Sequence, residues 1–376
     1  MTNLHEDRRA RLAAIAADRG LGAIAVVPGA NFAYLTGLQF HLMERPTLLF
    51  ITAGGQILGI IPELEREKWA ATLPGAVTFY WQDSAGYDAA FAGAVAALEG
   101  AVIGVEVMRM RVFEADALRR HAGQGAVVDA EGWLAGLRLC KSPAEVACLQ
   151  AAIDISELAL AETVAEVRAG MTERQIQSLL KMRMLAGGAE GFAFEPLVLA
   201  GANAANPHGV SGDRVLGPGD ALLVDFGASV AGYNADITRT FFCGHVTEDH
   251  ADLYGTVLAA NAQGRAVAGP GMTAHELDSA VTAVLAASRF AGLIVHKTGH
   301  GLGLDVHEAP QIMVGNHSPL IPGAVFTIEP GLYRPADIGV RIEDNVVITD
   351  SGALSLTRYS RALTVIGPYI DQRTRR

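Results

Sequence analysis

One short pattern occurs twice in the chain, 101 residues apart, and it limits the possible folds more than any other feature. Gly-Met-Thr stands at 170–172 and again at 271–273, followed by Gln175 and Glu276 respectively. In each copy the glycine suits the end of one helix, and the threonine forms a capping box with the Gln or Glu three residues later. Turn-rich sequence typical of strands follows each copy, at 194–243 and 293–348. This predicts two related halves, each a helix pair packed on antiparallel strands. The alternative is a chance match, because Gly-Met-Thr can join any two helices.

The sequence before this repeat alternates between helical and strand patterns, which is typical of an α/β domain. The expected helices cover 6–19, 63–73, 84–99 and 111–122, and the expected strands cover 23–27, 48–51, 57–61, 77–81 and 102–106. Residues 142–145 (Ser-Pro-Ala-Glu) form a capping box with proline at the first helical position, so a long helix should begin there. We therefore predict an α/β domain over 1–132 and an α+β domain with an internal pseudo-twofold repeat over 133–376. A chain of 376 residues exceeds what one core usually serves, in agreement with two domains.

Charge and composition exclude several classes of partner. The chain has 29 Lys and Arg against 40 Asp and Glu, a net charge of −11. Nucleic acids and anionic membranes need clustered positive charge, so neither is expected as a partner. No apolar run reaches the ~20 residues that cross a bilayer, and the N-terminal residues lack the apolar core of a signal peptide. The three cysteines form no CxxC pair, which fits a reducing compartment. These features predict a cytoplasmic protein.

Two aspartates lie where a hairpin could bring them together. Asp225 ends an apolar run, and Asp236 follows eleven residues later, beyond the turn at Gly232. Strands joined by that turn would bring both carboxylates onto one face. The structural alternative is that Asp225 caps a turn and Asp236 pairs with Arg239.

Three more residues with metal-binding side chains follow along the chain. His300 lies between two glycines, which let the backbone approach a ligand closely, and Glu329 and Glu343 each end an apolar run. Four carboxylates and one imidazole in apolar surroundings need a cation, because several desolvated like charges would otherwise lie together. Two metals that share carboxylates account for five ligands, and an oxygen-rich set with one histidine suits Mn²⁺, Co²⁺ or Zn²⁺. Paired metals lower the pKa of a shared water, so the set predicts a hydrolase.

The ordered set Asp, Asp, His, Glu, Glu resembles the pita-bread metallohydrolases. These include Xaa-Pro dipeptidase (prolidase), aminopeptidase P, methionine aminopeptidase and the metal-free creatinase. Residues 31–37 (Asn-Phe-Ala-Tyr-Leu-Thr-Gly) are similar to the signature of the creatinase-type N-terminal domain, which methionine aminopeptidases lack. Residues 137–145 (Leu-Arg-Leu-Cys-Lys-Ser-Pro-Ala-Glu) resemble the usual start of the catalytic domain. The resemblance covers nearly the whole chain. It implies a creatinase-like domain over 1–132 and a pita-bread catalytic domain over 133–376.

The resemblance also implies a ligand set for two divalent metal ions, with manganese expected and cobalt or zinc as alternatives. Asp225 would hold one metal, Asp236 and Glu343 would bridge both, and His300 and Glu329 would complete the second. All five residues are present. Their presence disfavours both a metal-free chemistry like that of creatinase and a relative that has lost its ligands and only binds peptides.

Further polar residues match the proline-specific members of the family. By resemblance, His208 and His307 contact the scissile peptide and stabilise its oxygen, and His296 shapes the substrate pocket. Arg341, two residues before Glu343, matches an arginine near the site, which is expected to bind substrate through a carboxylate contact or to support a metal ligand. Glu329 is expected to take a proton from water and pass it to the proline nitrogen as general base and then acid. The alternative for the three histidines is a structural, hydrogen-bonded role.

Arg45 lies in a polar loop at 38–46. In family dimers the N-terminal domain of one subunit narrows the active-site mouth of the other. The resemblance therefore implies a homodimer, in which Arg45 could capture the free carboxylate of a dipeptide. A solvated loop is the alternative.

Together these observations predict a cytoplasmic Xaa-Pro peptidase with two metals, with dipeptidase favoured over aminopeptidase P acting on longer peptides. Hydrolysis of a non-peptide amide, as in ectoine hydrolase-like relatives, would use the same metal set. A peptide-binding module is the non-enzymatic alternative.

Overall fold

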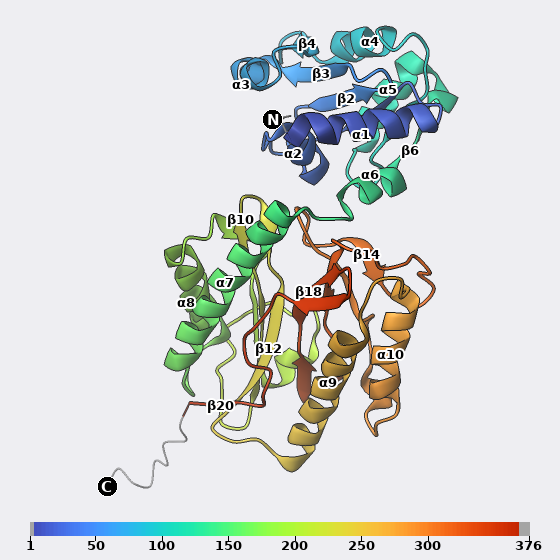
Figure 1. Ribbon diagram of the computed structural model, residues 1–376. Coiled ribbons are helices and arrows are strands. Elements are labelled where there is room, and N and C mark those ends of the chain that lie inside the picture. Colours follow the sequence, from blue (N-terminus) through green and yellow to red (C-terminus); the bar gives the residue numbers. More distant parts are fainter. Residues whose placement is uncertain (1–3, 368–376) are drawn as a thin grey trace. The chain divides into compact units, whose positions relative to one another are not determined.

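The computed structural model describes residues 4–367 (Figure 1), which form two compact units. The first unit ends at Arg138 and the second begins at Leu139. The assignment of 1–132 and 133–376 as the two domains stays a prediction. Over the described range, no helix is both long enough and apolar enough to cross a membrane.

The first unit is built on one mixed six-stranded sheet with strand order β4-β3-β2-β1-β5-β6. Its strands are β1 (Ala23–Val26), β2 (Leu48–Thr52), β3 (Ile57–Pro62), β4 (Val77–Trp81), β5 (Ile103–Val105) and β6 (Val127–Asp129). Its α-helices are α1 (Leu4–Asp18), α2 (Ala30–Thr36), α3 (Arg66–Thr72), α4 (Asp88–Ala96), α5 (Val112–Ala122) and α6 (Glu131–Arg138). The central strand β1 pairs antiparallel with β2 and parallel with β5, and its four residues are buried. The predicted α/β fold of this part is confirmed.

The second unit combines two helix pairs with two sheets in which the strand pairs are antiparallel, except for the parallel pair made by Val365–Ile366. Its α-helices are α7 (Pro143–Glu166), α8 (Glu173–Ala186), α9 (Glu248–Val267) and α10 (Ala274–Ala286). One sheet has the order β20-β12-β9-β8, with β8 (Leu197–Ala200), β9 (Ala221–Phe226), β12 (Ile237–Cys243) and β20 (Val365–Ile366). The other has the order β14-β13-β15-β18-β19, with β13 (Gly299–Gly301), β14 (Glu308–Ile312), β15 (Val325–Ile328), β18 (Asp344–Thr349) and β19 (Gly352–Ser355). Shorter strands complete the unit: β7 (Gly191–Phe192), β10 (Ala228–Val230), β11 (Tyr233–Asn234), β16 (Gly331–Arg334) and β17 (Ile338–Arg341).

The internal repeat predicted from the sequence is confirmed by equivalent hydrogen bonds in both halves. Thr172 and Thr273 are N-caps, and each forms a capping box with the residue three positions later. The amide of Gly170 donates to Leu216 O (2.9 Å), and the amide of Gly271 donates to Leu320 O (2.8 Å). Each half therefore joins its helix pair to its sheet in the same way, which is the pseudo-twofold relation of the pita-bread fold.

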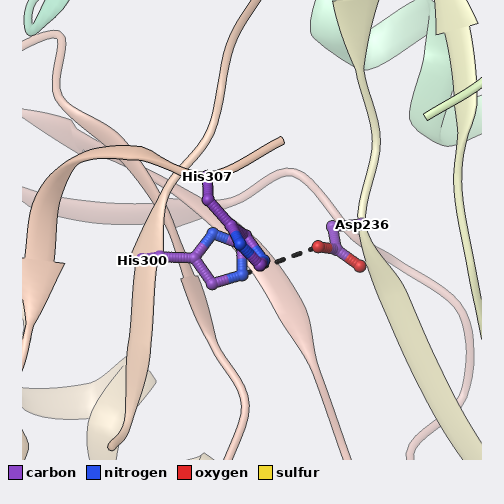
Figure 2. Close-up of side chains that lie close together, drawn as sticks. All are labelled: Asp236, His300 and His307. Carbon is purple, nitrogen blue, oxygen red and sulfur yellow. Dashed lines mark ion pairs between the residues drawn. The ribbon is translucent and has the colours of Figure 1, made fainter. Parts of the chain in front are cut away.

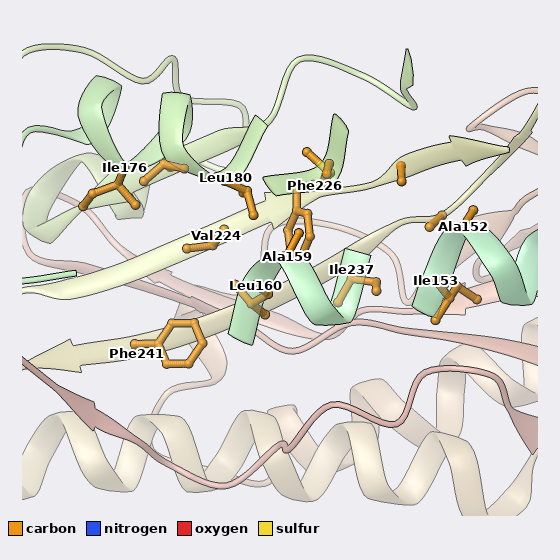
Figure 3. Packing of buried hydrophobic residues seen from close by; sticks show 14 of the residues in the cluster. Ala152, Ile153, Ala159, Leu160, Ile176, Leu180, Val224, Phe226, Ile237 and Phe241 are labelled. Carbon is orange, nitrogen blue, oxygen red and sulfur yellow. The ribbon is translucent and has the colours of Figure 1, made fainter. Parts of the chain in front are cut away.

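Apolar side chains lock the first helix pair onto the β9–β12 hairpin (Figure 3). Ile153 and Leu160 of α7 and Leu180 of α8 are fully buried in a cluster with Phe226 of β9 and Ile237 of β12. A second buried cluster joins α9 and α10 to the sheet that contains β15 and β18. The two clusters fix the two hairpins that carry the polar residues of the site.

Candidate metal centre

The two aspartates lie on one hairpin, as predicted. Asp225 is in β9, where it is paired in register with Thr238 of β12, and Asp236 immediately precedes β12. Asp225 and Asp236 are buried, at 8% and 4% exposure. Their proximity comes from the strand pairing, so it does not depend on a flexible loop.

Glu343 reaches this hairpin from the other sheet. It directly precedes β18, and its amide donates to Thr238 O (3.1 Å). Its Oε2 accepts a hydrogen bond from Thr238 Oγ1 (2.6 Å). Thr238 therefore orients the carboxylate of Glu343 toward Asp225 and Asp236.

His300 and Glu329 come from neighbouring strands of that second sheet. His300 Nε2 lies 3.6 Å from Asp236 Oδ2 (Figure 2). It also lies 3.3 Å from Glu329 Oε1. The glycine before His300 has a steric reason: a Cβ on Gly299 would lie 2.0 Å from Thr327 O. Only glycine allows the two backbones this close approach, which places His300 beside Glu329.

All five predicted ligands are thus brought together. Ligand atoms of Asp225, Asp236 and Glu343 lie within 4.8 Å of one another, and so do those of His300, Glu329 and Glu343. His307 forms a third such group with Asp236 and His300, and its ring centroid is 3.9 Å from that of His300. The cluster lies in a pocket of about 930 Å³.

Burial makes this cluster of like charges costly without a cation. Burial raises the pKa of Asp236 well above its ordinary value, and the charges of Glu343 and Asp225 raise it further. Burial also raises the pKa of Glu329 to about 7 and that of Glu343 well above its ordinary value. For His300, burial lowers the pKa to about 3, so the imidazole is neutral and its nitrogen is free to bind a metal.

Arg341 is paired with Asp225 inside the site. Its Nη2 donates to Asp225 Oδ2 (2.5 Å), its Nη1 to the Tyr333 hydroxyl (2.5 Å) and its Nε to Thr238 Oγ1 (3.0 Å). The other oxygen of Asp225, Oδ1, is buried and accepts no hydrogen bond from the described residues. Arg341 thus holds one oxygen of Asp225 and leaves the other available for a cation.

The three predicted substrate histidines all line the pocket. His208 and His307 are exposed at its surface. His296 Nε2 lies 2.9 Å from the Tyr333 hydroxyl, and burial lowers the pKa of His296 to about 4. Arg45 belongs to the first unit, where its Nη2 pairs with Asp83 (2.7 Å) and its Nη1 with Glu44 (2.8 Å).

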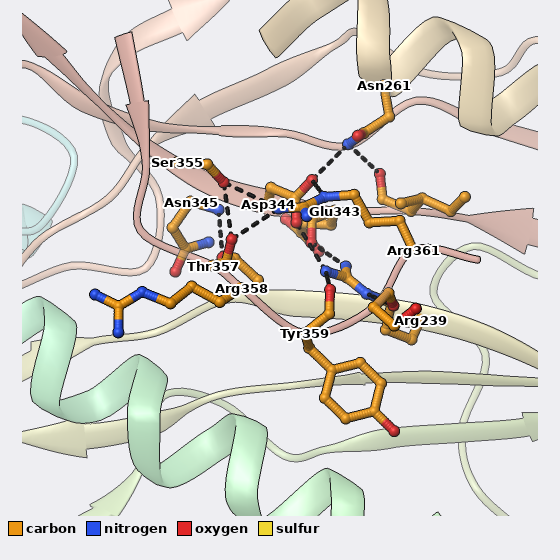
Figure 4. Close-up of polar contacts among 12 residues, drawn as sticks. Arg239, Asn261, Glu343, Asp344, Asn345, Ser355, Thr357, Arg358, Tyr359 and Arg361 are labelled. Atoms are coloured by element: carbon orange, nitrogen blue, oxygen red, sulfur yellow. Dashed lines mark hydrogen bonds and ion pairs between the residues drawn. The ribbon is translucent and has the colours of Figure 1, made fainter.

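One structural alternative from the sequence is wrong: Arg239 does not pair with Asp236. Arg239 pairs with Asp344, whose carboxylate also accepts hydrogen bonds from Arg361 and Asn261 (Figure 4). Although burial opposes ionisation, Arg239 and Arg361 hold the pKa of Asp344 below its ordinary value. Arg239 also donates to the backbone carbonyl of Glu343 (2.6 Å), so this buried network fixes the backbone of a predicted ligand.

Four further residues of the site were not predicted. Thr238 could have been found, because it lies two residues after Asp236 on the same face of a strand. Tyr333 has no such local signal. The ion pair between Lys141 Nζ and Glu308 Oε1 (2.6 Å) also has no local signal, because the two residues are far apart in the sequence. This pair fixes the position of Glu308, which directly follows His307.

Comparison with known proteins agrees with this geometry. Residues 147–350 match metallopeptidase family M24, and residues 8–140 match the creatinase/prolidase N-terminal domain. The Xaa-Pro dipeptidase of Pyrococcus furiosus is 38% identical over 227 residues, which are 60% of this chain and 65% of that protein. A probable dipeptidase PepE of Mycobacterium tuberculosis is 35% identical over 96% of both chains. The solved prolidase of Thermococcus sibiricus superimposes with a TM-score of 0.92 at 29% identity, over 97% of this chain and all of that one. The chain therefore belongs to metallopeptidase family M24 and has a creatinase/prolidase N-terminal domain.

Proposed function

We propose that the protein is a metal-dependent Xaa-Pro peptidase, and specifically an Xaa-Pro dipeptidase. The observation that carries the proposal is the convergence of Asp225, Asp236, His300, Glu329 and Glu343 in one pocket, with ligand atoms within 4.8 Å in overlapping groups. The relatives named above as an Xaa-Pro dipeptidase and a prolidase point to the same substrate class.

The donor set fits divalent metal ions. Asp225 Oδ1 is buried without a hydrogen-bond donor from the described residues, and three carboxylates of the cluster have raised pKa values, so added positive charge would be stabilising. Asp225 would hold one ion, His300 and Glu329 a second, and Asp236 and Glu343 both. We expect manganese, since carboxylates dominate the set, with cobalt or zinc as alternatives. When bound, such ions would activate water and polarise the scissile carbonyl.

Glu329 is the residue suited to move the proton. Burial raises its pKa to about 7, and its Oε1 accepts a hydrogen bond from Thr327 Oγ1 (3.2 Å), which fixes its rotamer. Its carboxylate takes a proton from the attacking water. It then gives that proton to the proline nitrogen as the C–N bond breaks.

His208 and His307 stabilise the charge that develops on the carbonyl oxygen. Both line the pocket, and both are exposed to it rather than buried in hydrogen bonds with the core. A donor placed where the oxygen becomes negative lowers the barrier more than it strengthens substrate binding. Arg341, held by Asp225 and Tyr333, keeps the ligand carboxylate in position.

The pocket wall suits a proline residue. Phe194, Leu197, Val295 and Val306 line it beside the polar cluster, and they can pack against the pyrrolidine ring. The nitrogen of an Xaa-Pro bond carries no hydrogen, so the site need not offer an acceptor for it. General peptide substrates would leave that amide donor unpaired in the pocket.

Aminopeptidase P activity is the second candidate, because a pocket of about 930 Å³ has room for more than a dipeptide. The discriminating experiment is hydrolysis of Ala-Pro, Ala-Pro-Ala and Ala-Ala by Mn²⁺-loaded protein, followed by mass spectrometry. Cleavage of Ala-Pro alone would support the dipeptidase. Cleavage of Ala-Pro-Ala would support the aminopeptidase, and cleavage of none would refute both.

The expected homodimer and cytoplasmic location stay predictions. The role of Arg45 depends on the dimer, since the hypothesis places it at the partner's active site. Arg45→Ala should weaken the preference for dipeptides over tripeptides. An unchanged preference would refute that role.

A further inference from the structure

One cation at the pocket wall has no role in the proposed mechanism. Two lining residues are lysine or arginine: Arg341 and Lys297. Arg341 is buried, and its guanidinium is bonded to Asp225, Tyr333 and Thr238. Lys297, in contrast, is exposed.

The hydrogen bonds of Lys297 leave its charge available to a ligand. In the described part of the chain, its Nζ donates to Gln311 Oε1, and it forms no ion pair with a carboxylate. Gln311 is itself held, because its Nε2 donates to Glu308 O (2.9 Å) on the same strand. An ammonium has three N–H donors, so Lys297 is positioned by one bond and keeps two for another partner. Arg45 differs, because Asp83 and Glu44 already neutralise it.

Lys297 also lies close to the reacting groups. It precedes the ligand His300 by three residues on the segment that enters β13. Lys297 and His307 line the same pocket, together with the five predicted metal ligands. The cation therefore faces the space in which a bound peptide would lie.

The geometry of a dipeptide makes such a cation selective. In Xaa-Pro the free carboxylate carbon is only two bonds from the scissile nitrogen, at about 1.46 and 1.52 Å per bond. A cation next to the cluster can therefore reach the carboxylate while the peptide bond is in place. In a longer peptide a neutral amide occupies that position, and the charge interaction is lost.

We propose that Lys297, positioned by Gln311, recognises the C-terminal carboxylate of the dipeptide and so determines the preference for dipeptides. This inference rests on the proposed Xaa-Pro activity. It adds a specificity residue from the catalytic unit itself.

The test compares an acid with its amide in the Mn²⁺-loaded full chain. Binding of the uncleavable reduced isostere of Ala-Pro and of its C-terminal carboxamide is measured by calorimetry, and hydrolysis of Ala-Pro and Ala-Pro amide is measured in parallel. Lys297→Met should weaken binding of the acid about 10- to 100-fold, the loss expected for one hydrogen bond between charged partners. Binding of the amide should stay unchanged, and the effect on Ala-Pro should be in KM rather than kcat. Lys297→Arg should retain most of the acid preference.

Lys181→Met is the matched control, because Lys181 belongs to the same unit, pairs with exposed Glu195 and does not line the pocket. It should leave both ligands unaffected. The inference would be overturned if Lys297→Met weakened binding of the acid and of the amide equally, or weakened neither. It would also be overturned if Arg45→Ala lost the preference for the acid and Lys297→Met kept it. If the wild-type protein neither cleaves Ala-Pro nor binds either isostere, the proposed function fails and the inference falls with it.

Discussion

Glu106 should make the stability of the first unit depend on pH. It is 1% exposed, and burial raises its pKa to about 7 from an ordinary value of 4.5. Its Oε1 accepts from the amide of Val27 (2.6 Å) and its Oε2 from Asn31 Nδ2 (2.7 Å). These two hydrogen bonds lower the pKa of Glu106, but burial raises it by more.

The sign and size follow from linkage. Below pH 4.5 the carboxyl is protonated in both the folded and the unfolded states, so it makes no difference to stability. Between pH 4.5 and about 7 the folded state keeps the proton and the unfolded state loses it. Stability therefore falls as pH rises through this window, by about 3 kcal/mol at about 1.4 kcal/mol per pKa unit.

Tryptophan fluorescence can isolate this unit in a urea titration. The three tryptophans, Trp69, Trp81 and Trp133, all lie in the first unit.

The free energy of unfolding of the wild type, measured by fluorescence, should decline between pH 5 and 7.5, and Glu106→Gln should flatten the decline. The variant can keep two hydrogen bonds, because Asn31 Oδ1 is buried without a partner and can turn toward the new amide. Glu67→Gln, an exposed change in α3, should keep the wild-type slope. A wild-type stability that is flat or rising over this range would refute the reasoning.

Three further predictions concern the catalytic unit. Lys141→Met should destabilise it by about 3–5 kcal/mol, because the buried carboxylate of Glu308 would lose the cation that pairs with it. The double variant Lys141→Met, Glu308→Leu should recover most of this loss in urea titrations followed by circular dichroism. Arg341→Met should weaken Mn²⁺ binding about 10- to 100-fold in calorimetry, since Asp225 loses the donor that orients it, and unchanged affinity would contradict this role. Chelation with EDTA should lower the unfolding midpoint seen by circular dichroism and leave the tryptophan transition in place, because metals stabilise only the unit that binds them.

The sequence was sufficient to find the residues that the structure brings together in the pocket, because most of them have a local signature. Asp225, Glu329 and Glu343 each end an apolar run of the sequence, and the glycines around His300 indicate a close backbone approach. The repeat was visible for the same reason, since a capping box is a pattern within four residues. These features need no knowledge of which strands pair.

The contacts that support those residues could not be predicted, because they depend on strand register or on long-range packing. Tyr333 reaches Arg341 through the β16–β17 hairpin, and Lys141 reaches Glu308 across 167 positions. A shift of one residue in the β16–β17 pairing would turn Tyr333 to the opposite face. Local patterns do not carry that information.

The failed pairing of Asp236 with Arg239 shows how strand alternation connects the site to its support. Asp236 directly precedes β12, and by strand alternation its side chain and that of Thr238 lie on one face while that of Arg239 lies on the other. Residues three apart on an extended segment therefore do not meet. Glu343 and Asp344 are divided in the same way: Glu343 accepts from Thr238, and Asp344 accepts from Arg239. Thr238 and Glu343 thus face the cluster of predicted ligands, and the residues that follow them, Arg239 and Asp344, face a buried ionic network. Arg239 is the neighbour of Thr238, and Asp344 is the neighbour of Glu343, so the ion pair between Arg239 and Asp344 also fixes the positions of Thr238 and Glu343. The geometry of the cluster therefore depends on the buried ionic network on the opposite face of the strands as well as on contacts within the pocket.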